Sequence, residues 1–320
     1  MSQADSSTPL SVIIPVCERT ENTLATFKEY QEYLGAKFTQ PEYIFVVSKG
    51  NHHIGDQLVD HAKDAKNITV MYMSRDFGEA TAIQAGMSKA TGELILILPT
   101  YKQVETSSLG KLFEHIEEYD LVLAKRWPRI DTAGNQIQTK TFNYLLRKFS
   151  GQNFTDIGCG VRLLKSVAAK ELNLYGDQHR FLPLLVHQIG YSFTEIELPQ
   201  AKDDAGTRLY TPQVYLRRLL DLLTVVFLTK FNKKPLRFFG LLGSGSIGIG
   251  ALGLLYLALE RFAWGIPLSD RPLLVMFCLF FVLGFQLLAI GLIGEIIIFT
   301  HAGDQKEYRI KKIHDQDSPD

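Results

Sequence analysis

The residues of this sequence that are best placed to do chemistry follow two apolar runs. Lys49 comes shortly after the run at 43–47, and Lys102 comes shortly after the run at 93–98. In an open α/β sheet, ligands bind just outside the carboxyl ends of the strands. A lysine there can neutralise a phosphate as a point charge, although a solvated loop lysine fits the same pattern. The sequence therefore predicts a ligand site around 99–105 and leaves the role of both lysines open.

A third basic residue lies between a predicted strand and a predicted helix. Arg75 precedes Gly78, near which the helix is expected to begin. Helix N-termini favour anions because their backbone N–H groups are unpaired. Arg75 and Gly78 therefore form a candidate anion position. The structural alternative is a salt bridge from Arg75 to Asp76 or Glu79.

Alternating strands and helices must position these residues. Continuous apolar runs predict buried strands and helically spaced apolar residues predict helices. The predicted strands are 10–16, 43–47, 68–73, 93–98 and 121–124; the predicted helices are 20–35, 55–65, 80–90 and 106–118, with a polar loop at 48–55. Short links between alternating elements indicate a mainly parallel sheet with helices on both faces.

The composition excludes several classes of function. Lys and Arg together number 34, as do Asp and Glu, so no overall charge favours a nucleic acid partner. The cysteines are far apart, which fits a reducing compartment and no metal cluster. They are Cys17, Cys159 and Cys278. The polar N-terminus lacks an apolar signal core, so the first domain is expected in the cytosol.

The chain divides by composition into a domain at 1–210 and a membrane region. The membrane region is predicted to run from 238 to 299 and to contain two helices. A helix over 238–259 would span about 33 Å, enough for a hydrocarbon core of about 30 Å, and a second helix over 272–297 would cross again. Residues 211–237 predict an interfacial amphipathic helix, or alternatively a core helix of the first domain. Basic residues flank the pair on its outer sides, which places both termini, including the polar tail at 300–320, on the cytosolic side of a plasma (bacterial inner) membrane.

Small residues recur in the first apolar segment. They fall at Gly240, Ser244 and Gly248, and again at Ser246 and Gly250. Such spacing allows two helices to approach closely. The sequence therefore predicts helix–helix contact, either within the pair or between protomers of a homo-oligomer.

Several blocks of sequence, taken in order, resemble one known family. They are Ser11–Val16, Ser74–Gly78 with Gln84–Gly86 and Ala90–Glu93, Asp156–Leu164, His179–Pro183, Gly291–Glu295 and Lys306–Tyr308. The first blocks resemble the family-2 glycosyltransferases of GT-A fold. The later blocks and the two-helix tail are similar to the polyprenyl-phosphate branch of that family, which includes enzymes like dolichol-phosphate-mannose synthase and bactoprenol glucosyltransferase. The resemblance covers nearly the whole chain.

The resemblance implies a GT-A (Rossmann-like) domain that moves a sugar from a nucleotide-sugar to polyprenyl phosphate at the cytosolic membrane face. We predict that the nucleotide-sugar is bound by residues at or beside the site that the resemblance implies, namely Pro15, Glu18, Ser48, Lys49, Arg75, Gly78 and Lys102. Among these, Glu18 would hydrogen-bond a ribose.

The resemblance also assigns residues to the acceptor side of the site. It implies that Asp156 orients or deprotonates the acceptor phosphate and that Arg162 fixes the loop around it. An Asx-turn before Gly158 is the alternative for Asp156. Arg126 and Arg208 are candidates to meet the lipid phosphate, with capping of the sheet as the alternative for Arg126.

The sequence departs from the family at two acidic clusters. Where the family has a pair of aspartates after the second strand, this chain has Ser48 and Lys49. The family's Asp-x-Asp after the fourth strand holds Mg²⁺ or Mn²⁺, which prefer hard oxygen ligands, but here Pro99 and Tyr101 replace both carboxylates. We therefore predict no metal ligands. Two hypotheses remain: a metal-independent transferase, or an inactive relative that binds a lipid, a nucleotide-sugar or a partner enzyme.

Carboxylates from neighbouring positions could take the place of the two missing clusters. Asp76 and Glu105 are the nearby candidates in the sequence. We expect Asp76 to point away.

Overall fold

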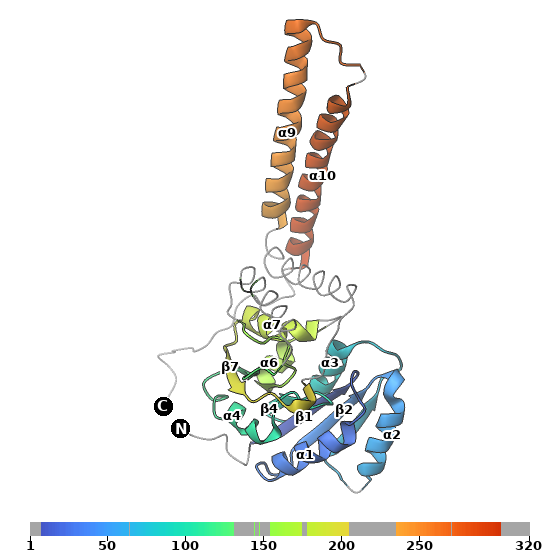
Figure 1. Ribbon diagram of the computed structural model, residues 1–320, viewed down its shortest axis with the longest axis vertical. Coiled ribbons are helices and arrows are strands. Elements are labelled where there is room, and N and C mark those ends of the chain that lie inside the picture. The colour runs from blue at the N-terminus through green and yellow to red at the C-terminus, as the bar shows by residue number, and fades with distance from the viewer. Residues whose placement is uncertain are drawn as a thin grey trace. The chain divides into compact units, whose positions relative to one another are not determined.

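The computed structural model describes residues 8–63, 65–130, 144, 147, 154–174, 178–204, 235–269 and 271–301. These residues form two compact units, one within Met1–Val225 and one within Val226–Glu307. The first contains a sheet with its helices and the second contains two long helices (Figure 1). Arg208 and nearly all of the expected interfacial helix and C-terminal tail lie outside the described residues.

A seven-stranded sheet forms the centre of the first unit. Its strands are β1 (Leu10–Val16), β2 (Glu42–Val47), β3 (Ile68–Tyr72), β4 (Leu94–Ile97), β5 (Leu121–Arg126), β6 (Arg162–Lys165) and β7 (Phe193–Leu198). They lie in the order β3-β2-β1-β4-β6-β5-β7. The pairs β1–β2, β1–β4, β2–β3 and β5–β7 are parallel, whereas β6 runs antiparallel to β4 and β5. The mainly parallel sheet predicted from sequence is confirmed.

Helices cover both faces of this sheet. They are α1 (Thr23–Gly35), α2 (His52–His61), α3 (Glu79–Lys89), α4 (Gly110–Phe113), α6 (Ser166–Glu171) and α7 (Leu182–Gln188), with 3₁₀ turns at Lys49–Asn51, Thr106–Ser108, Gln178–Phe181 and Lys202–Asp204. Phe27 of α1 and Leu58 of α2 pack with Phe45 of β2. Its neighbour Val46 packs with Ala82 of α3 on the other face. This alternation follows from the two-residue period of a strand.

Gly86 lets α3 lie close to the sheet. A Cβ atom at this position would lie 2.5 Å from Cγ2 of Ile13 in β1. The close approach places the start of α3 near the carboxyl ends of the central strands, because α3 follows β3 and packs against β1.

Two of the predicted elements differ in the structure. The segment at 48–55, predicted to be a loop, contains a 3₁₀ turn and the start of α2. The predicted helix at 106–118 is instead a 3₁₀ turn followed by the short helix α4. Ser108 donates a hydrogen bond to the carbonyl of Glu105 at 2.6 Å, and the N–H of Gly110 donates to the hydroxyl of Tyr33. These bonds compete with a regular helical ladder.

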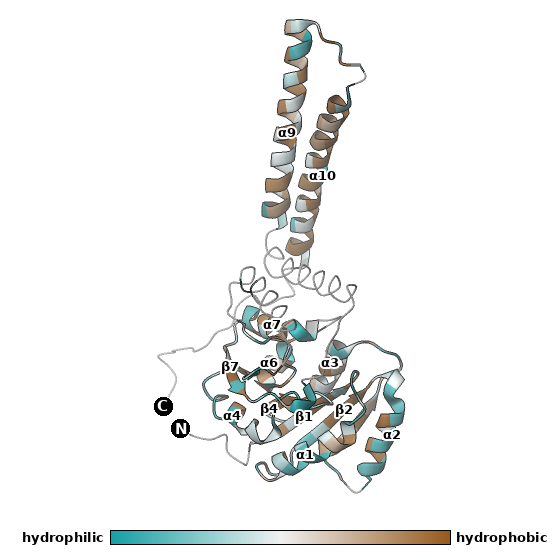
Figure 2. Ribbon diagram, in the orientation of Figure 1, coloured by the Kyte–Doolittle hydropathy of each residue, from teal (hydrophilic) through white to brown (hydrophobic). Residues whose placement is uncertain are grey.

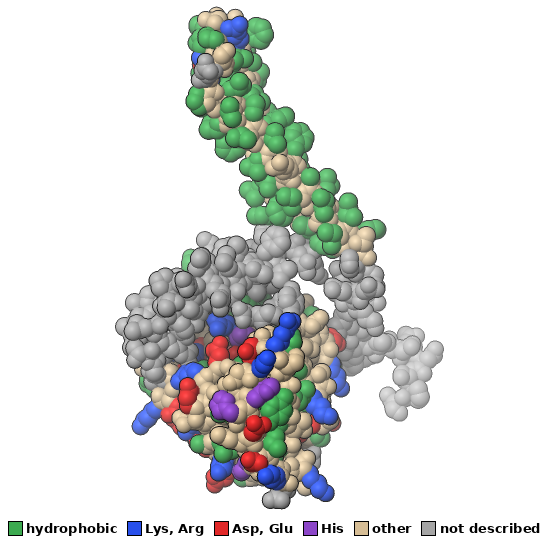
Figure 3. All heavy atoms as spheres, turned by 90° about the vertical axis from the view of Figure 1, so that its right-hand side faces the viewer, with side chains coloured by type: hydrophobic (Ala, Val, Ile, Leu, Met, Phe, Trp, Pro, Cys, Tyr) green, Lys and Arg blue, Asp and Glu red, His purple; other side chains and the backbone are tan. Residues whose placement is uncertain are grey.

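The second unit consists of α9 (Pro235–Trp264) and α10 (Pro272–His301). Both helices are long and apolar enough to cross a membrane, and only 22% and 6% of their apolar windows are buried. Apolar side chains therefore cover the outside of the pair (Figures 2 and 3). Exposed apolar surface of this extent fits a lipid environment, and the chain is a membrane protein.

The two long helices pack through small residues. Cβ atoms placed on Gly243 and Gly250 would lie 2.7 Å from backbone atoms of Gly284 and Phe281 in α10. Ser246 donates a hydrogen bond to the carbonyl of Phe280 at 2.7 Å. Of the two predicted kinds of helix contact, the structure shows the one within the pair for Ser246 and Gly250.

We expect Gly250→Ala to weaken this packing. The added methyl group must displace backbone atoms of α10, and overpacking of this kind costs about 1–3 kcal/mol. Gly248→Ala is the matched control, because a Cβ at Gly248 meets nothing within 4 Å. The measurement is the free energy of unfolding of the full chain in detergent. Equal stability of the two variants would contradict the proposed contact.

Candidate functional site

The carboxyl ends of three strands meet at one edge of the sheet. β1 pairs in parallel with β2 on one side and β4 on the other. The hydroxyl of Thr100, after β4, donates to the carbonyl of Glu18, after β1, at 2.8 Å. Asn51, after β2, donates to the carbonyls of Val16 and Cys17. The loops after the three strands are therefore joined by hydrogen bonds.

Of the two residues that directly follow β2, Ser48 is buried and Lys49 is exposed. Ser48 is 5% exposed, and its hydroxyl donates to the carbonyl of Val16 and accepts from Asn51. Lys49 is exposed at the start of the 3₁₀ turn. Ser48 therefore supports the loop, and Lys49 is the one of the two that solvent and ligands can reach.

Pro15 and Glu18 also differ in their exposure to solvent. Pro15 lies buried inside β1, opposite Val46 of β2 and beyond the part of β1 that pairs with β4. Glu18 is exposed just after the strand.

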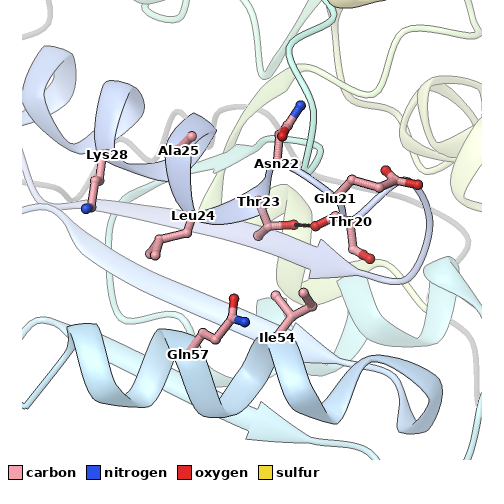
Figure 4. Close-up of a pocket in the computed structure, with 9 residues that line it drawn as sticks. All are labelled: Thr20, Glu21, Asn22, Thr23, Leu24, Ala25, Lys28, Ile54 and Gln57. Carbon is pink, nitrogen blue, oxygen red and sulfur yellow. Dashed lines mark hydrogen bonds between the residues drawn. The ribbon is translucent and has the colours of Figure 1, made fainter.

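A cavity of about 340 Å³ lies beside this edge, between the first turns of α1 and α2 (Figure 4). Two of the lining residues are joined by a hydrogen bond from the Thr23 hydroxyl to the carbonyl of Thr20, and the Thr20 hydroxyl donates to the side chain of Asn51. Its lining mixes polar and apolar side chains and includes the charged residues Glu21 and Lys28. The cavity is thus connected through Asn51 to the loops after β1 and β2.

The loop after β4 offers no carboxylate at 99–101, and its Tyr101 ring lies against a cation from the loop after β1. The guanidinium carbon of Arg19 lies 3.9 Å from the centroid of the Tyr101 ring. The Tyr101 hydroxyl accepts a hydrogen bond from Gln103, and the other end of Gln103 accepts one from the N–H of Gly160. Thr100 is 3% exposed, and its hydroxyl lies within donating distance of the carbonyls of Glu18 and Arg19.

Arg19 is held from two further sides. One of its nitrogens donates to the carbonyl of Asp203 at 2.9 Å, and the other lies 3.7 Å from the carboxylate of Asp204. Its side chain remains 37% exposed. Arg19 was not among the residues predicted from the sequence. It could have been found there, because it follows a buried strand closely, as Lys49 and Lys102 do.

The residues at this edge do not fit a divalent ion. Pro99 offers no side-chain donor, Thr100 is already bonded, and Tyr101 lies beneath a cation. Among the residues that the structure describes, no group of three His, Cys, Asp or Glu side chains is placed to hold a metal. Glu105 is exposed, and Asp76 accepts a hydrogen bond from the N–H of Gly50 at 3.3 Å. Neither carboxylate joins a metal-binding group there.

Lys102 is paired with acidic side chains. Its ammonium lies 2.9 Å from the carboxylate of Glu29 and 3.9 Å from that of Asp203. The hydrogen bond to Glu29 raises the pKa of Lys102 above its ordinary value. Lys102 is therefore a fixed positive charge beside Arg19, since both contact Asp203.

Arg75 makes a contact that neither sequence alternative named. Its guanidinium carbon lies 4.5 Å from the centroid of the Phe77 ring. Gly78 precedes α3 with φ of +89°, a conformation that glycine adopts without strain. Arg75 is exposed next to this helix start.

A buried ion cluster lies at the ends of β5 and β7. Arg126, 3% exposed, donates two side-chain hydrogen bonds of 2.7 Å to Asp156 and one of 2.8 Å to Asp204. Arg129 lies 3.2 Å from the same Asp156 carboxylate, and Gln200 donates to Asp204 at 2.7 Å. Arg126 therefore holds two carboxylates together inside the protein and does not present its guanidinium to solvent.

The environment of Asp156 keeps it ionised. Burial alone would raise the pKa of this carboxyl, but the charge and hydrogen bonds of Arg126, together with Arg129, outweigh burial and lower it. Both carboxylate oxygens accept hydrogen bonds from arginine. In this arrangement Asp156 positions the cluster, and it has no oxygen left without an arginine partner to take a proton from an acceptor.

Arg162 holds together two segments of the chain. It is 3% exposed and donates to the carbonyls of Ile157, Cys159 and His179. Burial lowers its pKa to about 10. These hydrogen bonds join the segment at 157–159 to the segment at His179, and the loop-fixing role of Arg162 stays a prediction.

His179 is a buried neutral base. Burial, aided by the charges of Arg180 and Arg162, lowers its pKa to about 3. Its Nε2 lies 3.4 Å from the carboxylate of Glu79 at the start of α3, and its Nδ1 has no hydrogen-bond partner. Because the imidazole is neutral at physiological pH, the contact with Glu79 is not a salt bridge there.

Comparison with known proteins relates this geometry to a family. The sequence model of glycosyl transferase family 2 matches residues 11–172. The dodecaprenyl-phosphate galacturonate synthase of Rhizobium johnstonii is 28% identical over 258 residues, covering 78% of this chain and 76% of that protein. The undecaprenyl-phosphate 4-deoxy-4-formamido-L-arabinose transferase of Pectobacterium atrosepticum is 28% identical over 309 residues, covering 95% of this chain and 93% of that protein.

Solved structures share the fold of the first unit. The mannosyl-3-phosphoglycerate synthase from Rubrobacter xylanophilus matches with a TM-score of 0.53 at 14% identity, covering 70% of this chain and 74% of that chain. At that identity the likeness concerns the fold alone.

We expect Arg126→Met to lower the free energy of unfolding by about 3–5 kcal/mol at neutral pH, because it removes the buried cation that the carboxylates of Asp156 and Asp204 share. In the wild type, the lowered pKa of Asp156 contributes stability above the unfolded value of about 4, which is lost as pH falls through the folded value. In the variant the buried carboxyl of Asp156 keeps only Arg129 as a cationic partner, so its protonated form is favoured more than in the wild type. The difference between the two proteins should therefore shrink toward pH 4.

The control for this variant is Lys125→Met in the same strand, whose ion pair with Glu197 is partly exposed. It should cost at most about 1 kcal/mol. Denaturant unfolding of the full chain in detergent, followed by far-UV circular dichroism, measures both variants. A pH-independent effect of Arg126→Met would contradict the assigned charges.

We expect His179 to make the folded state sensitive to mild acid. Its folded pKa of about 3 lies below the unfolded value of about 6.5, so the unfolded state binds the proton first. Its stabilising contribution is complete above pH 6.5, and roughly 2 kcal/mol is lost between pH 6.5 and 5. His179→Gln should remove that part of the pH dependence of unfolding. An unchanged slope in the variant would show that His179 is not the titrating group.

Proposed function

Because this chain belongs to glycosyl transferase family 2 and has the GT-A fold, we propose that it transfers a sugar from a nucleotide-sugar to a polyprenyl phosphate. The observation that carries the proposal is the full-length match. A polyprenyl-phosphate sugar transferase aligns over 95% of this chain, which includes both membrane helices. Helices that keep the chain at the membrane bring a lipid acceptor to the sheet domain.

The transfer exchanges one bond for another at the sugar. A phosphate oxygen of the lipid forms a bond to the anomeric carbon, and the bond from that carbon to the nucleoside diphosphate breaks. The diphosphate leaves with the electron pair. A phosphate monoester has a second pKa near 6, so the acceptor is already an anion at pH 7 and needs no general base.

The exposed charges suit this chemistry better than the buried ones. We propose that Lys49, Arg75 and Lys102 contact phosphates of the donor, as point charges or a guanidinium fork, and that Glu18 contacts the ribose. Ser48, Pro15 and Gly78 then shape the backbone around the donor. This assignment is supported by their places at the carboxyl edge and at the start of α3.

Buried residues support the acceptor side from within. Asp156, Arg126 and Arg162 position the segments around them rather than contacting the substrate. Arg208 remains proposed for the lipid phosphate. We further propose that the chain crosses the plasma membrane twice with both termini in the cytosol, with domain boundaries as predicted from sequence. Basic residues that flank the apolar segments support this orientation.

The test is transfer by the full chain in nanodiscs that contain undecaprenyl phosphate. A panel of radiolabelled UDP- and GDP-sugars is supplied, and label in the lipid extract is measured. We expect label that depends on undecaprenyl phosphate, and a fall of about tenfold or more in kcat/KM for Lys49→Ala, since a charge-assisted contact contributes about 1.5–3 kcal/mol.

Lys63→Ala is the control, because Lys63 forms an exposed pair with Asp60 away from the site. It should leave transfer unchanged. Full activity of Lys49→Ala would return Lys49 to its alternative role as a solvated loop residue. Lipid binding without transfer of any sugar in the panel would favour the inactive relative, which the replaced aspartates also suggest.

A further inference from the structure

The carboxyl edge of β1 and β4 presents a guanidinium where the family resemblance places a metal-bound diphosphate. We propose that Arg19, stacked on Tyr101, holds the diphosphate of the donor in place of a divalent ion. The inference rests on the proposed function and names the group that makes donor binding independent of metal. It starts from the misfit between the residues at this edge and the ion.

The position of Arg19 is fixed before any ligand binds. Tyr101 supports the guanidinium from below at 3.9 Å, the carbonyl of Asp203 accepts a hydrogen bond at 2.9 Å, and Asp204 lies 3.7 Å away. Asp204 is itself fully buried and bonded to Arg126. A cation held in this way loses little conformational entropy when an anion arrives.

The backbone of Arg19 itself has an unfavourable conformation. Its φ is +52°, in the left-handed region that costs a residue with a side chain free energy relative to glycine. Such strain persists only where the surrounding contacts enforce it, and it gathers at functional sites. The contacts around Arg19 therefore hold its backbone in this conformation.

The chemistry of the side chain fits a diphosphate. Guanidinium remains charged at any physiological pH and can donate two parallel hydrogen bonds to phosphate oxygens. With 37% of its side chain exposed, Arg19 can be reached from solvent. Lys102 adds a second cation, because both residues contact Asp203.

The acidic neighbours leave room for an incoming phosphate. The side chains of Asp203 and Glu29 are 56% and 43% exposed, so both can turn to solvent when phosphate oxygens take the place of their carboxylates. Asp204 stays compensated by Arg126. The two cations would then face the diphosphate from one side of the site.

The test separates binding from stability by using Arg19→Gly. Glycine accepts the positive φ without strain, which offsets part of the stability lost with the contacts of the Arg19 side chain, and each variant's melting temperature without ligand is its own reference. The full chain in detergent is titrated with UDP and GDP, in EDTA and in Mn²⁺, and affinity is taken from the ligand-dependent shift in melting temperature.

We expect wild-type binding of at least one of these nucleotides to persist in EDTA and to weaken about tenfold or more in Arg19→Gly. Arg19→Lys, which keeps the charge but loses the fork, should fall between the two. The control is Lys63→Ala, because Lys63 forms an exposed ion pair with Asp60 and is distant from Arg19 in the sequence. This variant should bind the nucleotides as the wild type does.

Two results would overturn the role of Arg19 while leaving the proposed function intact. They are wild-type binding only in the presence of Mn²⁺, and equal affinity of Arg19→Gly and the wild type in EDTA. Failure of the wild type to bind either nucleotide under both conditions would overturn this inference together with the proposed nucleotide-sugar chemistry.

Discussion

The buried ion cluster of Arg126 with Asp156 and Asp204 is the interaction on which the rest of the site depends. It joins the end of β5 to the segment before β6 and to the turn after β7. An uncompensated charge in the interior costs several kcal/mol, so each member of the cluster requires the others. Through Asp204 and Asp203 the same cluster fixes Arg19, and thereby connects the buried framework to the exposed edge.

The chemistry proposed at this edge requires the protein to stabilise negative charge on phosphates. Both substrates carry phosphates, and an ionised acceptor needs no base, so the main demand on the protein is fixed positive charge near the leaving group. Arg19 and Lys102 meet that demand at the ends of β1 and β4. The loss of the aspartates at 99 and 101 is then consistent with an altered means of holding phosphate rather than with the loss of a site.

Much of this arrangement could be predicted from the residues. The apolar runs identified five strands, and the ordered blocks identified the family, because both signals are local in sequence. The extent of 106–118 could not be predicted, since Tyr33 diverts the N–H of Gly110 from a helical bond. The roles of Asp156 and Arg126 were open for a similar reason: a charged residue after a strand looks the same whether it faces a ligand or a partner 30 residues away.

The resemblance to the family implied the replacement of the metal-binding carboxylates, and by itself the sequence determined the alternating α/β pattern and the two apolar helices. Periodicity and residue type are enough for these features, because they depend on neighbours along the chain. Only the tertiary structure decided that Arg126 is buried between two carboxylates, that Ser246 and Gly250 face α10, and that Arg19 lies on Tyr101. Those facts depend on burial and on contacts between distant segments, which no local pattern encodes.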